Sequence, residues 1–209
     1  NGTENGIQQE TVTITDDDTQ PTVTLSVDNA TIAEASGVAT FTATLSNPST
    51  QNVTVNLAFS GTATGSGTDY TASGASILIT AGNTTGAITV TADQDVIFEG
   101  NETVIVDIDS VTNGSESGVQ QETTTISDDD TQPTVTLSVD NATIAEASGV
   151  ATFTATLSNS SSQNVTVNLA LSGTAVGSGT DYTASGTSIL ITAGNTTGNI
   201  TVTADQDLL

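Results

Sequence analysis

Apolar side chains recur at every second position along much of the chain, and this is the pattern of half-buried β-strands. In the clearest segments, Val, Leu, Ala and Phe alternate with Thr, Ser and Asn. Runs rich in Gly, Ser, Asn and Thr separate the segments, and no window has a convincing 3.6-residue period. The pattern predicts strands and no helix. In one stretch of the chain these strands are expected at residues 23–27, 39–45, 53–59, 77–79, 88–90, 104–108 and 124–126.

A comparison of the sequence with itself shows a long internal repeat. Residues 1–97 align without gaps on residues 113–209, an offset of 112, and only 13 of the 97 positions differ. A period of this length is the size of a domain, so the repeat predicts tandem domains, arranged as beads on a string. Seven short strands per repeat predict an all-β fold, a seven-stranded antiparallel β-sandwich of immunoglobulin-like character.

The repeat frame divides the chain into three parts if each repeat begins at the turn around Pro21. Residues 1–18 are then expected to be the C-terminal strand of a preceding repeat, and residues 19–130 a complete repeat. Residues 131–209 are expected to be an incomplete repeat that lacks its last two strands. We expect the natural chain to continue past Leu209 and supply them.

The charge of the chain narrows the possible functions. It contains 24 Asp and Glu residues but no Lys, Arg, His or Cys, which gives a formal net charge of −24. Binding to nucleic acid or to anionic membranes needs Lys or Arg, so neither is an expected partner. No apolar run is long enough to insert into a membrane. Most catalytic groups are missing, and Glu99 and Glu102 lie three residues apart in an acid-rich loop, so we do not expect an enzyme.

The acidic residues of the complete repeat are concentrated in particular loops. In a sandwich whose strands run alternately up and down, the loops after the first, third, fifth and seventh strands lie at one end. Ten of the 14 acidic residues of the repeat fall in those loops. They are Asp28, Glu34, Asp69, Asp93, Asp95, Glu99, Glu102, Asp128, Asp129 and Asp130.

Carboxylates that converge without a cation repel one another, and a divalent ion relieves that repulsion. Calcium takes six to eight oxygen ligands in flexible geometry, and the chain has no His or Cys to favour zinc or copper. The acidic end is therefore expected to bind Ca²⁺. The alternative is a solvated loop surface, which is the usual role of a run of charges.

The chain contains the motifs AEASG (33–37), GTDY (67–70), TADQDVIFEGNETVIVDI (91–108) and the closing TVTITDDD or TTTISDDD. These motifs resemble those of the Calx-beta domain, a calcium-binding module known from the sodium/calcium exchanger and from long bacterial surface proteins. Carried over by motif, the resemblance implies calcium ligands at Glu34, Asp69, Asp95, Glu99, Glu102, Asp128, Asp129 and Asp130. The family often has two adjacent acids where this chain has Asp93, Gln94 and Asp95, which leaves open the number of ions and a role for Asp93.

The same ligand set extends to the other copies through the 112-residue offset. The later repeat is expected to contribute Glu146, Asp181, Asp205 and Asp207. Asp16, Asp17 and Asp18 are expected to close the site of a preceding repeat.

Near-identical tandem copies favour a structural role. We expect a stalk, matrix fibre or filament segment of an extracellular bacterial surface protein, in which calcium stiffens the junctions between neighbouring repeats. Such a segment is compatible with self-association into filaments, and the sequence does not identify an adhesive target. The alternative is a regulatory calcium sensor like the cytoplasmic pair of the exchanger. Carbohydrate binding by a sheet face is a third possibility without a residue signature.

Overall fold

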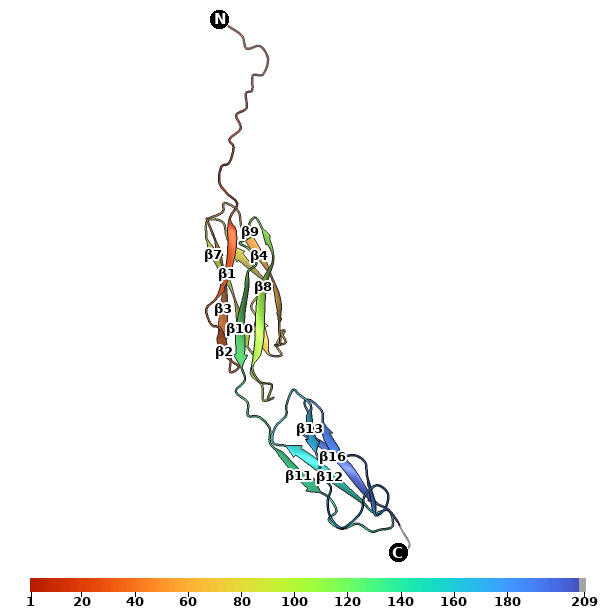
Figure 1. The fold of residues 1–209 in the computed structure, drawn as a ribbon. Helices are drawn as coiled ribbons and strands as arrows, with labels where there is room; N and C mark the ends of the chain where they lie inside the picture. The colour runs from red at the N-terminus through yellow and green to blue at the C-terminus, as the bar shows by residue number, and fades with distance from the viewer. Residues whose placement is uncertain (207–209) are drawn as a thin grey trace.

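The computed structural model describes residues 1–206 of the chain. These residues form strands, turns and extended segments, and none of them belongs to a helix long and apolar enough to cross a membrane. Two β-units follow one another along the chain, with the N- and C-termini at opposite ends (Figure 1). The first unit is made from residues 19–130, called the first repeat, and the other from residues 131–206, called the second repeat.

The first repeat contains two five-stranded sheets that pack face to face. In spatial order, one sheet contains β5 (Tyr70–Ala72), β7 (Thr85–Ala92), β3 (Val38–Leu45), β1 (Thr22–Val27) and β9 (Ser115–Glu116). The other contains β2 (Thr31–Ala33), β10 (Gln121–Ser127), β8 (Glu102–Thr112), β4 (Val53–Gly61) and β6 (Ser76–Ile79). The fold is therefore an all-β sandwich, as the two-residue periodicity predicted.

The core of the first repeat lies between the two sheets, because each strand turns alternate side chains inward. In β3, Ala39, Phe41, Ala43 and Leu45 are buried, while the Thr side chains between them are only partly covered. The same alternation buries Val, Ile and Leu side chains of β4, β6, β7 and β8. Burying each such side chain fully contributes about 1.5–3 kcal/mol. All buried members of this core lie between Val23 and Ile126, so the second repeat contributes none of it.

The seven predicted strands correspond to β1, β3, β4, β6, β7, β8 and β10. The structure adds three short strands that the sequence pattern did not predict, β2, β5 and β9. The sandwich is also not purely antiparallel, because β1 pairs with β9 and β2 with β10 in parallel.

The chain changes sheets between β1 and β2, which places β2 beside β10, and again between β8 and β9, which places β9 beside β1. Residues 28–30 make the first crossing, and Thr124 and Thr125 of β10 fix it by donating hydrogen bonds to the carbonyls of Asn29 and Ala30, both at 2.9 Å. Asp28 accepts a hydrogen bond from the Thr40 N–H at 2.7 Å, so its carboxylate stabilises the turn. That bond also lowers the pKa of Asp28.

The second repeat follows the same course with fewer strands. One sheet contains β11 (Val135–Val139), β12 (Val150–Leu157), β16 (Thr197–Ala204) and β14 (Tyr182–Ala184), and β13 (Val165–Asn168) pairs with β15 (Ser188–Ile191). Within residues 131–206 no strand corresponds to β2, β8 or β10. Of these three strands, β10 packs against β1 in the first repeat, and the copy of Leu25 shows the effect of its absence. Leu25 is 5% exposed, whereas Leu137 is 53% exposed.

Residues 1–18 form no strand within this chain, and their role as the last strand of a preceding repeat stays a prediction. They are exposed and extended, without strand pairing. The equivalent strand in the first repeat is β10, which is held by hydrogen bonding to β8 on one side and β2 on the other. No described strand offers residues 1–18 either of these partners.

The difference in burial between the two copies predicts unequal effects of matched core substitutions. Phe41 is fully buried, whereas its copy Phe153 is only partly buried. Phe41→Ala should lower the free energy of unfolding of the first repeat by about 3–5 kcal/mol, and Phe153→Ala should lower that of the second repeat by clearly less. Each repeat has one tyrosine, so urea unfolding followed by Tyr fluorescence in Tyr182→Phe or Tyr70→Phe backgrounds reports one repeat at a time. Equal losses in the two copies would contradict this account of the cores.

Candidate metal centre

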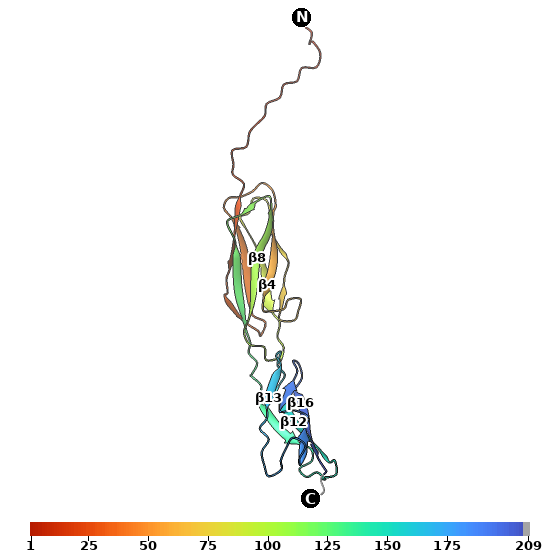
Figure 2. The same cartoon turned by 45° about the vertical axis from the view of Figure 1, so that its right-hand side comes forward.

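Four chain segments meet at the end of the first repeat that faces the second. They are the turn after β2, the β4–β5 loop, the β7–β8 loop (residues 93–101) and the residues after β10. Strands β4, β7 and β10 all end at this end of the sandwich, as alternating strand direction requires (Figures 1 and 2). The structure thereby brings together six of the predicted ligands in two groups of three.

The first group consists of Asp69, Glu99 and Glu102, which have carboxylate oxygens within 4.8 Å of one another. Asp69 is only 7% exposed. Its Oδ2 accepts a hydrogen bond from the Thr64 N–H at 2.5 Å, which fixes the side chain in the loop. Its Oδ1 is buried and has no hydrogen-bond partner among the described residues. An unpaired buried carboxylate oxygen is costly, so this atom is available to a cation.

The second group consists of Glu34, Asp128 and Asp130, again with oxygens within 4.8 Å. Glu34 is 5% exposed, and its two oxygens accept hydrogen bonds from the backbone N–H groups of Asp95 at 3.1 Å and Asp129 at 3.4 Å. Asp130 Oδ2 is buried without a hydrogen-bond partner among residues 1–206. Each group therefore contains one carboxylate oxygen that the protein leaves unpaired.

Asp128 joins this group to the β7–β8 loop. Its Oδ2 accepts hydrogen bonds from the N–H groups of Glu99 at 3.0 Å and Gly100 at 2.5 Å. Gly100 has a φ of 78°, a left-handed conformation that a residue with a side chain rarely adopts. The turn at Gly100 directs two successive N–H groups at the same carboxylate oxygen.

The two groups border a common cavity. Its volume is about 10 Å³, close to the space needed by one water molecule. Five of its six acidic lining residues belong to the two groups, and Asp93 is the other. The cavity is lined by Glu34, Asp69, Asp93, Glu99, Gly100, Glu102, Ile126 and Asp128.

Burial and mutual repulsion raise the pKa values of these acids. Burial, together with the charges of Asp69, Asp95, Glu34 and Asp128, raises the pKa of Glu99 from 4.5 to about 7. Burial also raises the pKa of Glu102 to about 7, together with the neighbouring Asp69 carboxylate and the charges of Glu99 and Asp128. The pKa values of Glu34 and Asp130 are raised as well, in both cases mainly by burial.

These features fit a hard divalent cation. The donor atoms are all oxygens, two of them are buried and unpaired, and the chain has no Lys, Arg or His to neutralise them. Calcium prefers such carboxylate oxygens and tolerates irregular geometry. Glu34, Asp69, Glu99, Glu102, Asp128 and Asp130 would hold it.

Three other predicted ligands lie around the groups rather than within them. Asp93 lines the cavity but accepts a hydrogen bond from the Thr71 hydroxyl at 2.8 Å. Asp95 Oδ1 accepts the Ile97 N–H at 2.7 Å, which caps the β7–β8 loop. Asp129 is exposed and accepts a hydrogen bond from Gln94 at 3.0 Å.

Neutral residues that the sequence did not single out support the site. Thr71 and Gln94 orient Asp93 and Asp129, and Asn101 Oδ1 accepts the Asp128 N–H at 3.3 Å. Gln94 and Asn101 belong to the same acidic motif as Asp95 and Glu99. Their position in that motif was the only signal for them, because neutral polar residues are common in loops.

The corresponding acids of the second repeat are farther apart. Glu146, Asp181 and Asp205 line an open depression of about 340 Å³. Asp181 and Asp205 are half-buried, but Glu146 is exposed, unlike its buried copy Glu34. Among the described residues of this repeat, no three carboxylates approach as closely as those of the first repeat. Asp207 lies outside the described residues.

Asp16, Asp17 and Asp18 lie at the opposite end of the first repeat. They form a third group of exposed carboxylates, in which Asp16 Oδ1 accepts the Asp18 N–H at 3.0 Å. That bond makes an Asx turn, which an acidic run forms without any ion.

The fold and the site together define a class of protein: tandem β-sandwich domains that group buried carboxylates at one end. The family model of the Calx-beta domain matches residues 16–130 and 128–208. The chain belongs to the Calx-beta domain family, as the motifs predicted.

Solved structures similar to the chain include CBD12 from CALX1.2, with 18% identity, a TM-score of 0.41, and coverage of 83% of this chain and 72% of that chain. The apo form of the Calx CBD1 domain has 20% identity and a TM-score of 0.43, covering 52% of this chain and 99% of that chain. The calcium binding domain CBD12 of CALX1.1 has 15% identity and a TM-score of 0.42, covering 86% of this chain and 74% of that chain. No curated protein matches the chain.

The raised pKa values predict that the metal-free first repeat becomes more stable on mild acidification. A carboxyl whose folded pKa exceeds its unfolded value stabilises the folded state when protonated. For Glu99 and Glu102 this stabilisation is complete below pH 4.5 and is lost as the pH rises through about 7. In metal-depleted buffer, the urea midpoint of the first repeat should therefore be higher at pH 6 than at pH 8.

The matched control is the Glu99→Gln/Glu102→Gln double variant, measured with Tyr70 as the reporter in a Tyr182→Phe background. This variant should lose most of the pH dependence between pH 6 and 8. A parent protein whose midpoint is constant over that range would contradict the raised pKa values of Glu99 and Glu102.

Proposed function

We propose that the chain is a structural, calcium-binding repeat segment of a long extracellular surface protein, such as an adhesin stalk, matrix fibre or filament. The observation that carries the proposal is the pair of acidic groups at the end of the first repeat, each with one buried, unpaired carboxylate oxygen. The chain has no cationic side chain to compensate them. On this proposal the protein has no catalytic role.

The acidic groups link parts of the repeat that are distant in sequence. Glu34 follows β2, Asp69 precedes β5, Glu99 lies in the β7–β8 loop and Asp128 follows β10. Bound calcium would supply positive charge and accept oxygen ligands from all four segments. The residues that hold it would then fix these loops relative to the sandwich.

The same residues lie next to both connections between the repeats. Asp128 and Asp130 directly precede the linker at 131–134, which leads into β11. Glu99 follows Phe98, whose backbone forms hydrogen bonds with Ser160 and Ser162 of the second repeat. Ordering of the acidic end would therefore stiffen the junction, which is the property that a stalk requires.

The near-identity of the copies supports a stalk over a sensor. Only 13 of 97 aligned positions differ between the copies. A structural array needs equivalent units, whereas a sensor with two domains usually assigns them different affinities. An extracellular location is part of this proposal, because millimolar calcium suits weak structural sites.

Calorimetric titration with calcium tests the proposal directly. The full chain should bind with a dissociation constant of about 0.1–1 mM, the range of extracellular modules. Submicromolar binding would favour a regulatory sensor. Absence of saturable binding up to 10 mM calcium would refute the calcium role altogether.

Two kinds of variant separate a defined site from diffuse attraction of counterions. Asp69→Asn and Glu99→Gln should each weaken binding by about tenfold or more, because each removes a clustered carboxylate charge. Asp107→Asn removes the same charge from β8, outside the acidic groups, and should leave the affinity nearly unchanged. Similar losses in all three variants would indicate diffuse counterion binding instead.

A further inference from the structure

The β7–β8 loop of the first repeat forms a defined backbone contact with the second repeat. Phe98 N–H donates to the Ser160 carbonyl at 3.2 Å, and the Phe98 carbonyl accepts from the Ser162 N–H at 3.1 Å. These bonds make a parallel β-bridge between Phe98 and Ser161. The Ser161 hydroxyl donates a third hydrogen bond to the Phe98 carbonyl, at 3.2 Å. The partner segment is the β12–β13 loop, residues 158–164.

The β3–β4 loop (residues 46–52) of the first repeat is the copy of the β12–β13 loop, and the two loops share two of their internal hydrogen bonds. Ser49 Oγ accepts the Gln51 N–H at 3.0 Å, and Ser161 Oγ accepts the Gln163 N–H at 3.1 Å. The carbonyls of both serines accept a glycine N–H at 2.8 Å. The surface that receives Phe98 in the second repeat is therefore already formed in the first.

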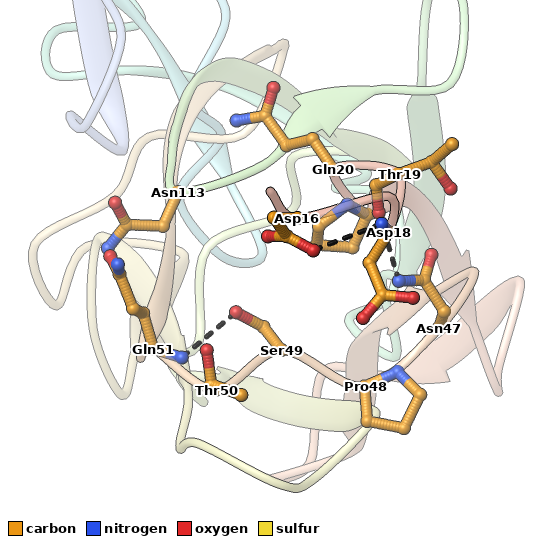
Figure 3. Close-up of a pocket in the computed structure, with 11 residues that line it drawn as sticks. Asp16, Asp18, Thr19, Gln20, Asn47, Pro48, Ser49, Thr50, Gln51 and Asn113 are labelled. Atoms are coloured by element: carbon orange, nitrogen blue, oxygen red, sulfur yellow. Dashed lines mark hydrogen bonds between the residues drawn. The ribbon is translucent and has the colours of Figure 1, made fainter. Parts of the chain in front are cut away.

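The two copies differ in whether another loop covers them. Ser161 is 4% exposed beneath the β7–β8 loop, whereas Ser49 is only half-buried. Ser49 lines a depression of about 480 Å³ at the free end of the first repeat, bordered by the β3–β4 loop and by residues 16–21 (Figure 3). The Pro48 carbonyl and the Thr50 N–H form no hydrogen bond within residues 1–206. They correspond to the two backbone groups that hold Phe98 in the second repeat.

The sequence differences between the two loops leave intact the groups that would form hydrogen bonds with a Phe98 backbone. Pro48 replaces Ser160, but the contact uses only the carbonyl of that residue, which proline retains. Thr50 replaces Ser162 and keeps its N–H. Ser49 is the copy of Ser161 and has the same hydroxyl, which in Ser161 donates to the Phe98 carbonyl.

We propose that the β3–β4 loop surface of the first repeat is a docking site for the β7–β8 loop of another copy of the repeat. The contact joins opposite ends of the repeat, so it is heterologous and extends head to tail rather than closing a dimer. It depends on backbone hydrogen bonds and not on bound calcium, so it stands apart from the proposed function.

Nuclear magnetic resonance of the full ¹⁵N-labelled chain tests this docking. The probe is a capped peptide with the sequence of residues 93–102, DQDVIFEGNE, added in chelator and about 0.3 M salt to screen the like charges of Asp16 and Asp18. We expect saturable shifts of the Thr50, Gln51 and Gly82 amides with a dissociation constant on the order of 1 mM, as suits three hydrogen bonds. The Ser162 amide should not shift, because its N–H already donates to the Phe98 carbonyl of the same chain.

The control peptide carries N-methylphenylalanine at the position of Phe98, which removes one donor and keeps the side chain. It should bind at least tenfold more weakly. Thr50→Ser, which mimics the second repeat, should retain binding, and Thr50→Pro, which lacks the N–H, should lose it while the remaining amide spectrum stays unchanged. No shift of the Thr50 amide at 5 mM peptide, or equal binding of the two peptides, would overturn the proposal.

Discussion

Repulsion among carboxylates that have no cationic partner is the interaction on which the acidic end of this protein depends. Two unit charges 4 Å apart repel by about 1 kcal/mol in water and by more where water is partly excluded. Glu34 and Asp69 are almost fully buried, and four further carboxylates lie beside them. Burial, together with the charges of the neighbouring carboxylates, raises the pKa values of Glu99 and Glu102 to about 7, so without an external cation protons reduce the charge of the acidic end.

The topology of the sandwich explains why these charges meet and why they affect the junction. Strands β4, β7 and β10 all end at one end of the sandwich, so the segments that follow them lie there. The crossing of the chain from β1 to β2 places Glu34 at the same end. Backbone N–H groups from the β7–β8 loop then hold Glu34 and Asp128 in position. That loop also contacts the second repeat through Phe98. The position of one loop therefore links the acidic groups to the next repeat.

The sequence predicted the seven long strands and the acidic end, because both follow from a two-residue period and from alternating strand direction. It did not predict β2, β5 and β9, which have two or three residues and too few side chains to show a period. It also did not predict the parallel pairs or which acids group together. Glu34 and Glu146 occupy the same local motif, AEASG, yet only Glu34 is buried. Its burial depends on β10 and on the β7–β8 loop, which are distant in sequence.

Thermal unfolding in calcium and in chelator tests the central claim most directly, namely that a cation bound by the acidic groups stabilises the first repeat. With a dissociation constant of about 0.1 mM, 10 mM calcium adds roughly 2.7 kcal/mol for each independent site. For a domain of this size, each kcal/mol raises the unfolding midpoint by about 4 °C or more. We expect the transition reported by Tyr70 to move upward by about 10 °C. Equal midpoints in calcium and in chelator would contradict the account.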